Sequence, residues 1–147
     1  MRALGIDLGT KRIGVALANS DGTLATPYEV VARSGDRARD HRAIAALAEE
    51  TGALALVVGL PLSLDGSVGP AAAAAQVEAD ELAEATGLPV ELWDERLTTV
   101  SADRDLLALD MKAGARRRVV DKVAAAVMLQ AWLDHRRLTP AHEDPAR

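Results

Sequence analysis

The sequence predicts an α/β fold in which a mixed five-stranded sheet is flanked by helices. Three strand-like segments come first and are joined by short turns, so they should pair in antiparallel fashion. Two further strand-like segments follow, and each comes after a helix-like segment, as parallel strands require. We place one domain at residues 1–138, with a flexible polar tail at 139–147.

Alternation of apolar residues with small or polar ones predicts the first two strands. Apolar side chains recur at every second position in Leu4–Leu8 and again in Ile13–Leu17, on either side of the turn Gly9-Thr10-Lys11. A third strand is predicted over Thr23–Val31. Pro27 favours a sheet edge for this strand, because proline has no N–H to donate to a neighbour.

A helix and a buried strand come next. The helix is predicted over Asp36–Glu50, and Gly52 ends it in the usual position of a terminating glycine. The chain is continuously apolar over Ala53–Val58, as in a strand that is covered on both faces. The preceding helix can serve as the crossover that a parallel strand needs.

The remaining strand leads to a group of charged residues. After a helix over Ala71–Thr86, a fifth strand is predicted over Val90–Trp93. It delivers Asp94-Glu95-Arg96 at its carboxyl end, where α/β sheets place ligand sites. The last predicted elements are helices over Thr99–Asp110 and Arg116–Arg137, with a break at Lys112-Ala113-Gly114. Trp93 and Trp132 are expected in the core.

Composition limits the chemistry that is open to this chain. The absence of cysteine excludes disulfides, thiolate metal sites and cysteine nucleophiles, so a metal ion would need carboxylates or histidines. The histidines have no ligand spacing and are expected at the solvated surface: His41, His135 and His142. No apolar run is long enough to span a membrane and no signal-peptide pattern is present, so a soluble cytoplasmic protein is expected.

The charges are distributed unevenly around a net charge of −5. Residues 1–42 carry 7 basic and 5 acidic side chains, residues 43–110 carry 2 and 13, and residues 111–147 carry 8 and 4. If the fold brings the two basic ends to one face, a phosphate backbone could dock there. Scattered solvated charges are the alternative interpretation.

Four short blocks occur in order along the chain. They are Gly5–Ala16 (GIDLGTKRIGVA), Gly59-Leu60-Pro61, Asp94–Thr99 (DERLTT) and Asp121–Ala125 (DKVAA). Together they resemble the YqgF/RuvX family from residue 2 to about residue 133. The resemblance implies a ribonuclease H-like fold, similar to that of Holliday junction resolvases, and a nuclease for the 5′ end of pre-16S ribosomal RNA.

Asp7 is a lone carboxylate in a strand otherwise made of apolar residues and glycine. Because an unpaired buried carboxylate is costly, a metal ion or a basic partner such as Lys11 or Arg12 is expected. Gly5 and Gly9 should leave space for a ligand beside the backbone. Actin-like ATPases and sugar kinases use a similar strand and turn for phosphate and Mg²⁺, but their fold needs two such domains.

Asp94 and Glu95 should point to opposite faces, so only one of them can join Asp7. Strand periodicity does not decide between them. The resemblance favours Glu95 as the ligand, with Asp94 fixing the loop. Arg96 could contact the scissile phosphate or neutralise Asp94.

Asp121 lies near the start of the last predicted helix. Small residues at Ala124 and Ala125 should let this helix approach the sheet closely and bring Asp121 near Asp7. The structural alternative is an i,i+4 ion pair with Arg117. The resemblance favours a metal-binding role for Asp121.

Asp7, Glu95 and Asp121 are therefore the predicted catalytic and metal-binding residues, with Mg²⁺ or Mn²⁺ as the cofactor. Basic residues near these acids are predicted to bind nucleic acid: Lys11, Arg12, Arg96, Arg116, Arg117, Arg118 and Lys122. Related junction resolvases often use a fourth acid three residues away on this helix, where this chain has Arg118 and Ala124.

The function that we expect is that of a metal-dependent nuclease in 5′-end processing of pre-16S rRNA, with RNA as the partner. Cleavage of four-way DNA junctions and non-catalytic nucleic-acid binding are the alternatives. With only 2% aromatic residues, binding should depend on phosphate contacts more than on stacking. The sequence leaves open whether the protein is a monomer or a dimer.

Overall fold

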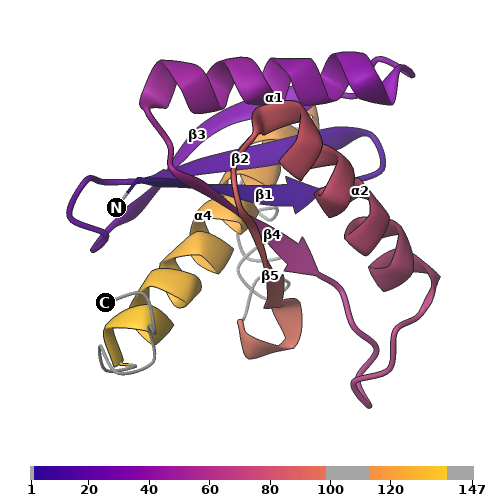
Figure 1. Ribbon diagram of the computed structural model, residues 1–147. Coiled ribbons are helices and arrows are strands. Elements are labelled where there is room, and N and C mark those ends of the chain that lie inside the picture. Colours follow the sequence, from indigo (N-terminus) through magenta and orange to yellow (C-terminus); the bar gives the residue numbers. More distant parts are fainter. Residues whose placement is uncertain (1, 99–112, 139–147) are drawn as a thin grey trace.

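The computed structural model of the chain describes residues 2–98 and 113–138. Its elements follow one another as in Figure 1: β1 (Ala3–Leu8), β2 (Arg12–Ala18), β3 (Ala25–Ala32), α1 (Arg37–Thr51), β4 (Ala55–Leu60), α2 (Pro70–Thr86), β5 (Val90–Asp94), the short 3-10 helix η1 (Glu95–Leu97) and α4 (Ala113–Leu138). The predicted helix over Thr99–Asp110 and the predicted tail at 139–147 lie outside the described residues.

The strands form one mixed sheet in the order β3-β2-β1-β4-β5. β1 lies at its centre, where it pairs antiparallel with β2 and parallel with β4. β5 extends the parallel half, and β3 forms the edge of the antiparallel half. The predicted α/β fold with a mixed five-stranded sheet is confirmed, and so is the edge position that Pro27 indicated.

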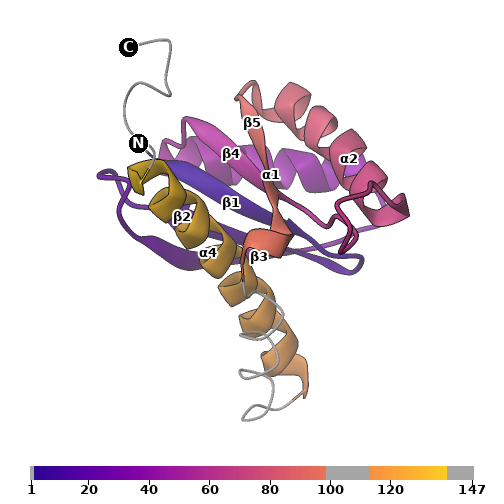
Figure 2. The ribbon, with the colours of Figure 1, turned by 90° about the horizontal axis from the view of Figure 1, so that it is seen from below.

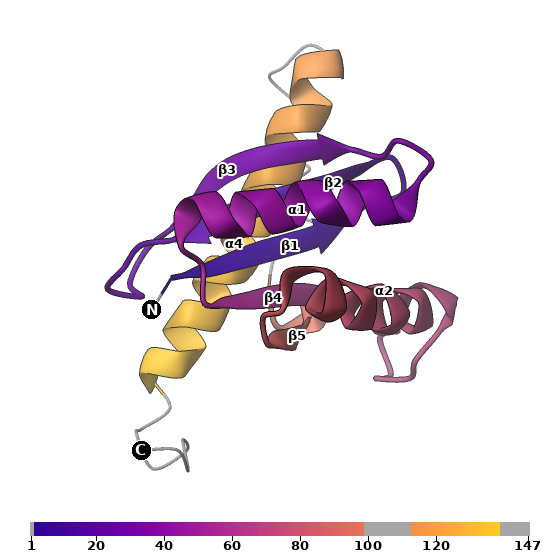
Figure 3. The same ribbon diagram turned by 45° about the horizontal axis from the view of Figure 1, so that its top comes forward.

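Helices cover both faces of this sheet. α1 and α2 lie on one face and α4 crosses the other, as Figure 2 and Figure 3 show from two directions. Alternation along β1 separates the two cores, because successive side chains of a strand point to opposite faces. Leu4 and Ile6 pack with Ile44 of α1, whereas Ala3 packs in the cluster beneath α4 with Leu129.

Several element boundaries agree with the sequence analysis. α1 begins after Asp36, whose side chain accepts a hydrogen bond from the backbone N–H of Arg39, and it ends at Gly52 with a φ of 71°. The central residues of β4 are fully buried, as expected of a strand covered on both faces. Trp93 and Trp132 belong to the core beneath α4, as predicted.

α4 crosses β1 and β2 at close range because glycines lie beneath it. A Cβ atom added to Gly14 would lie 2.1 Å from the backbone oxygen of Asp121, and one added to Gly5 would lie 2.8 Å from Cβ of Leu129. On the helix side, Ala125 is fully buried. The expectation that Gly5 leaves space for a ligand is wrong, because α4 fills that space.

The β1–β2 turn and the start of α4 bear on two other local expectations. A Cβ atom on Gly9 would lie 2.4 Å from the carbonyl oxygen of Arg12, so the lack of a side chain lets the β1–β2 turn close, and Gly9 also lines a cavity, in line with the expectation for this glycine. The break predicted at Lys112-Ala113-Gly114 is contradicted at Ala113 and Gly114, which are the first residues of α4. Among the described residues, no helix has the length and apolar character needed to cross a bilayer.

The close packing of α4 predicts a stability effect at Gly14. We expect Gly14→Ala to lower the free energy of unfolding by about 1–3 kcal/mol, because the added methyl group forces the Asp121 backbone away from β2. Urea unfolding followed by circular dichroism measures this change.

Gly69→Ala is the control for that substitution. Gly69 has a φ of −84°, and an added Cβ would meet only Ser63 Oγ, at 3.5 Å. Gly69→Ala should lower the free energy of unfolding by less than about 1 kcal/mol, because it changes only the residue that caps the N-terminus of α2. Equal losses in the two variants would contradict the packing argument.

Candidate active site

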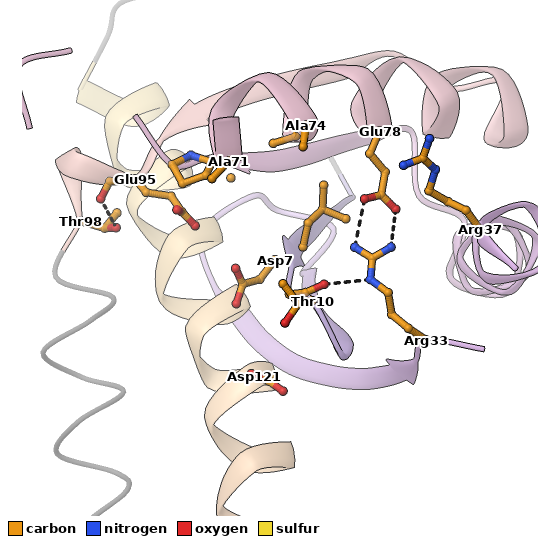
Figure 4. Close-up of a pocket in the computed structure, with 15 residues that line it drawn as sticks. Asp7, Thr10, Arg33, Arg37, Ala71, Ala74, Glu78, Glu95, Thr98 and Asp121 are labelled. Carbon is orange, nitrogen blue, oxygen red and sulfur yellow. Dashed lines mark hydrogen bonds and ion pairs between the residues drawn. The ribbon is translucent and has the colours of Figure 1, made fainter. Parts of the chain in front are cut away.

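The three predicted acids line one cavity, although they come from three separate elements. Asp7 lies near the end of β1, Glu95 begins η1 directly after β5, and Asp121 lies on α4. The cavity has a volume of about 630 Å³ and opens where the carboxyl ends of the parallel strands meet. In Figure 4, Asp7 lies between Glu95 and Asp121. Ligands commonly bind at this edge of α/β sheets.

Glu95 reaches the cavity because β4 has a glycine beside it. A Cβ atom on Gly59 would lie 2.7 Å from Glu95 Oε1, so any larger residue at this position would collide with the carboxylate. Gly59 itself lines the cavity. Gly59 in the block Gly59-Leu60-Pro61 therefore has a structural role, because it leaves room for the Glu95 carboxylate.

Asp94 does not line the cavity but holds the turn after β5. Its Oδ1 accepts a hydrogen bond from the Arg96 backbone N–H at 2.9 Å, and its Oδ2 lies 2.6 Å from Arg96 Nη2. These hydrogen bonds from Arg96 hold the pKa of the Asp94 carboxyl below its usual value. Of the two alternatives for Arg96, the structure thus shows neutralisation of Asp94, with a further hydrogen bond to the Leu64 carbonyl.

Asp121 is paired with a residue far away in sequence. Arg12 Nε, in β2, donates a hydrogen bond to Asp121 Oδ2 at 2.7 Å. Both side chains are about three-quarters covered, with exposed fractions of 26% and 20%. The i,i+4 alternative was a pair with Arg117, whose side chain lies outside the described part of the structure. The Arg12–Asp121 pair links the β1–β2 turn to α4 beside the cavity.

Carboxylates are the kind of ligand that a hard cation prefers, but in this structure the three carboxylates do not surround a common point. Mg²⁺ and Mn²⁺ prefer oxygen ligands, which Asp7, Glu95 and Asp121 supply. Within residues 2–98 and 113–138, no three acidic or histidine side chains are grouped closely enough to hold an ion. A metal ion shared by all three acids would therefore need these side chains to come closer together than they are in this structure.

The sequence analysis missed a buried polar network that lines the cavity beside Asp7. Arg33 donates hydrogen bonds through Nη1 and Nη2 to the Glu78 carboxylate at 2.8 and 3.0 Å, and through Nε to the Gly9 carbonyl at 2.8 Å. Its backbone N–H donates to the Lys11 carbonyl. His41 Nε2 lies 2.7 Å from Glu78 Oε2. The network ties α1, α2 and the end of β3 to the β1–β2 turn that follows Asp7.

The expectation that His41 is solvated is wrong, because its residue is only 3% exposed. A signal was present in the sequence. His41 is three residues before Ile44 and seven before Ala48, so it lies on the apolar stripe of its helix. Glu78 likewise lies between Ala75 and Leu82 on the buried stripe of α2. Polar residues at such positions need buried partners, and here they are partners of each other.

Glu78 is held in its charged form despite its burial. Burial acts to raise its pKa, but the hydrogen bonds from Arg33 and His41 outweigh this effect and leave the pKa lowered. The bidentate contact with Arg33 is the geometry in which a guanidinium binds a carboxylate most strongly.

The other predicted nucleic-acid-binding residues lie on the two segments beside Asp121. Lys11 is exposed in the β1–β2 turn, and Lys122 is half-buried on α4. Arg116, Arg117 and Arg118 lie in the first turns of α4, where the structure describes the backbone alone. His135 is exposed and makes an edge contact with Trp93, and His142 lies outside the described residues.

Comparison with known proteins identifies the family. The model of the family described as "RuvX: Holliday junction resolvase" matches residues 1–135. This chain belongs to the RuvX family. A RuvX relative from Myxococcus xanthus is 49% identical over 137 residues, which cover 93% of this chain and 90% of the relative. One from Mycobacterium ulcerans is 51% identical over 138 residues, or 92% and 80% of the two chains. Both relatives carry the name "Putative pre-16S rRNA nuclease".

Solved structures of RuvC share the fold of this RuvX chain. The Thermus thermophilus RuvC structure has a TM-score of 0.58 at 18% identity and covers 95% of this chain and 98% of RuvC. RuvC of the same organism in complex with a Holliday junction substrate has a TM-score of 0.56 at 17% identity, with 93% and 96% covered. At this identity the likeness shows the fold alone, which is the expected ribonuclease H-like fold.

The buried network predicts a large stability effect at Glu78. Glu78→Gln should lower the free energy of unfolding by about 3–5 kcal/mol at neutral pH, because it leaves the Arg33 guanidinium without its charged partner. Since the pKa of Glu78 is lowered on folding, its contribution is present above the usual glutamate pKa and is lost as the pH falls through the folded value. The difference between wild type and variant should therefore shrink below about pH 4.

Glu81→Gln is the matched control on the same helix. Glu81 pairs with Arg37 at 2.7 Å, but these side chains are 38% and 50% exposed. Its loss should cost less than about 1 kcal/mol, as is usual for surface pairs. Urea titrations at several pH values measure both variants, and a Glu78→Gln variant as stable as Glu81→Gln would contradict the role of the network.

Proposed function

We propose that this chain is a metal-dependent nuclease that hydrolyses phosphodiester bonds in the 5′-end processing of pre-16S rRNA. The observation that carries the proposal is that carboxylates from three separate elements line a single cavity at the carboxyl edge of the sheet. Membership of the RuvX family and the names of its relatives support nuclease activity and the rRNA substrate. Such a substrate would place the protein in the cytoplasm.

Asp7, Glu95 and Asp121 would hold Mg²⁺ or Mn²⁺ in this proposal. When bound, such ions supply an activated water and stabilise the negative charge on the leaving oxygen. Glu95 is kept at the cavity by Gly59 and by the turn that Asp94 and Arg96 fix. Asp7 lies in the central strand β1, where it pairs with Gly14 of β2 and directly follows Ile6, which pairs with Val58 of β4.

Arg12 has two successive roles in the proposal. In the structure it neutralises Asp121, and when Asp121 turns to a metal ion, the guanidinium becomes available for a substrate phosphate. Lys11, Lys122 and the run Arg116-Arg117-Arg118 would contact neighbouring phosphates. We assign Arg96 to the loop that it orders, since its guanidinium is held by Asp94 and the Leu64 carbonyl.

Asp7→Asn should abolish cleavage while leaving the fold intact. The variant keeps the size of the side chain but removes the charge that would hold the metal ion, so we expect a loss of about 10³-fold or more in rate. Asp94→Asn is the control, because it removes a carboxylate next to Glu95 that does not line the cavity, while the amide oxygen of Asn can still accept the Arg96 backbone N–H that fixes the turn. It should retain most of the activity.

Cleavage of a labelled pre-16S rRNA fragment in Mg²⁺ or Mn²⁺ tests both variants. If purified Asp7→Asn cuts as fast as wild type, the site assignment fails. If wild type binds the fragment without cutting it under any divalent metal, the alternative of a non-catalytic binding factor replaces the nuclease.

RNA should be cut faster than a four-way DNA junction. The family description and the shared RuvC fold make junction cleavage the second candidate function. Against it, neither Arg118 nor Ala124 supplies the further acid that junction resolvases often use near Asp121. The test compares pre-16S rRNA, unstructured RNA and a mobile junction at equal enzyme, salt and metal. Symmetric junction nicks that outpace RNA cleavage and disappear with Asp7→Asn would make this chain a resolvase.

A further inference from the structure

The cavity extends well beyond the three acids. In Figure 4, Glu95 lies on one side of Asp7, and Arg33, Glu78 and Arg37 lie on the other. The volume of about 630 Å³ is within the range of about 300–1,000 Å³ that is typical of small-molecule pockets. A water molecule occupies about 30 Å³, so metal ions with their waters would fill only a small part of this space. The remaining part can accept a larger group of the substrate.

The wall that α2 contributes is small and apolar. Ala71, Ala74 and Ala75 line the cavity from one face of this helix, at positions i, i+3 and i+4, and Pro61, just after β4, also lines it. Leu8, Gly9 and Thr10, at the end of β1 and in the turn, also line the cavity. None of these side chains is large enough to divide the space. The small apolar side chains on the α2 side suit the face of a planar group such as a nucleic-acid base.

The far end of the cavity is lined by cationic groups that are fixed in place. The Arg33 guanidinium is held by Glu78 and the Gly9 carbonyl, and Arg37 is held by Glu81. Half of the Arg37 side chain is exposed, so it can still meet a phosphate or a base edge. The cavity therefore combines carboxylates at one end, small apolar side chains from α2, and two guanidinium groups at the other end, of which Arg33 is paired with Glu78.

We propose that this part of the cavity binds one unstacked nucleotide of the substrate strand, adjacent to the phosphodiester bond at Asp7 and Glu95. The proposal rests on the proposed function and adds a substrate class to it. A base that is stacked in a duplex must be extruded at a cost of a few kcal/mol before it can enter, whereas a base in a flexible strand enters more easily. The cavity thus selects single-stranded or frayed segments.

Ala74 and Ala73 provide a matched pair of variants. Both are exposed alanines in the same part of α2, but only Ala74 lines the cavity. Ala74→Leu adds three carbon atoms to the apolar wall, and Ala73→Leu adds the same atoms outside it. A misfit of this size is expected to weaken binding of the base about tenfold or more, and Ala73→Leu should behave as wild type.

Binding is measured first, without metal ions, so that the result does not depend on cleavage. Single-stranded oligoribonucleotides carry the fluorescent base 2-aminopurine at successive positions, and its fluorescence rises when the base leaves the stack. Wild type and Ala73→Leu should raise the fluorescence at one position only, and Ala74→Leu should lose that rise and bind about tenfold more weakly. Equal signals and affinities in all three proteins would overturn the proposal.

Cleavage of oligoribonucleotides with a single abasic position gives the second measurement. In wild type, removal of the base at the position found by fluorescence should reduce kcat/KM about tenfold, and in Ala74→Leu the same removal should cause a much smaller loss. Additive losses would show that the base and Ala74 act separately, which would contradict the proposal. A free mononucleotide that binds as tightly as the oligonucleotide, and is weakened equally by Ala74→Leu, would make the cavity a site for a free ligand instead.

The outcomes separate this inference from the proposed function. A fluorescence rise that Ala74→Leu abolishes, in a protein that never cuts, would support the nucleotide site and refute the nuclease. Metal-dependent cleavage that Ala74→Leu leaves unchanged would support the nuclease and refute the nucleotide site.

Discussion

The close contact between α4 and the first two strands is the constraint on which the site depends. Gly14 lies so near the Asp121 backbone that no side chain fits between them. Gly5 likewise lies too close to Leu129 for a side chain to fit. Because the helix lies directly on the strands, its acid arrives beside the end of β1, where Arg12 can reach it. A helix held farther away by ordinary side chains would carry Asp121 out of reach of Asp7, and the cavity would lose one of its three acids.

Charge balance around the cavity follows from the same compact arrangement. Asp121 pairs with Arg12, Glu78 with Arg33, and Asp94 with Arg96. The pairs differ in function because they differ in surroundings. Glu78 and Arg33 also have the Gly9 carbonyl and His41 as partners, so this pair is part of the scaffold. In the Arg12–Asp121 pair, Asp121 lines the cavity, and in the proposed function a metal ion would take the place of Arg12 as its partner.

Much of this arrangement can be predicted from local sequence. Alternation in β1 and β2, the continuous apolar run of β4 and the glycine after α1 are each visible within a few residues, and each was confirmed. The long-range contacts cannot be predicted from local sequence. Arg12 and Asp121 are 109 positions apart, and Arg33 and Glu78 are 45 apart. Gly5 illustrates this limit. When only the strand is known, a glycine near an acid indicates space for a ligand. In the structure this space is filled by a helix more than 100 residues away in the sequence.

The family resemblance supplied what periodicity did not, namely the choice of Glu95 over Asp94. The structure adds the physical reason, which is the room that Gly59 leaves for the Glu95 carboxylate. The central claim is that Asp7, Glu95 and Asp121 form one metal site, and a crystal structure in saturating Mn²⁺, with anomalous scattering to locate the ion, tests it most directly. Our account predicts Mn²⁺ within coordination distance of Asp7 and Glu95, with Asp121 released from Arg12 and turned to the ion. An intact Arg12–Asp121 pair with no Mn²⁺ at Asp7 would contradict it.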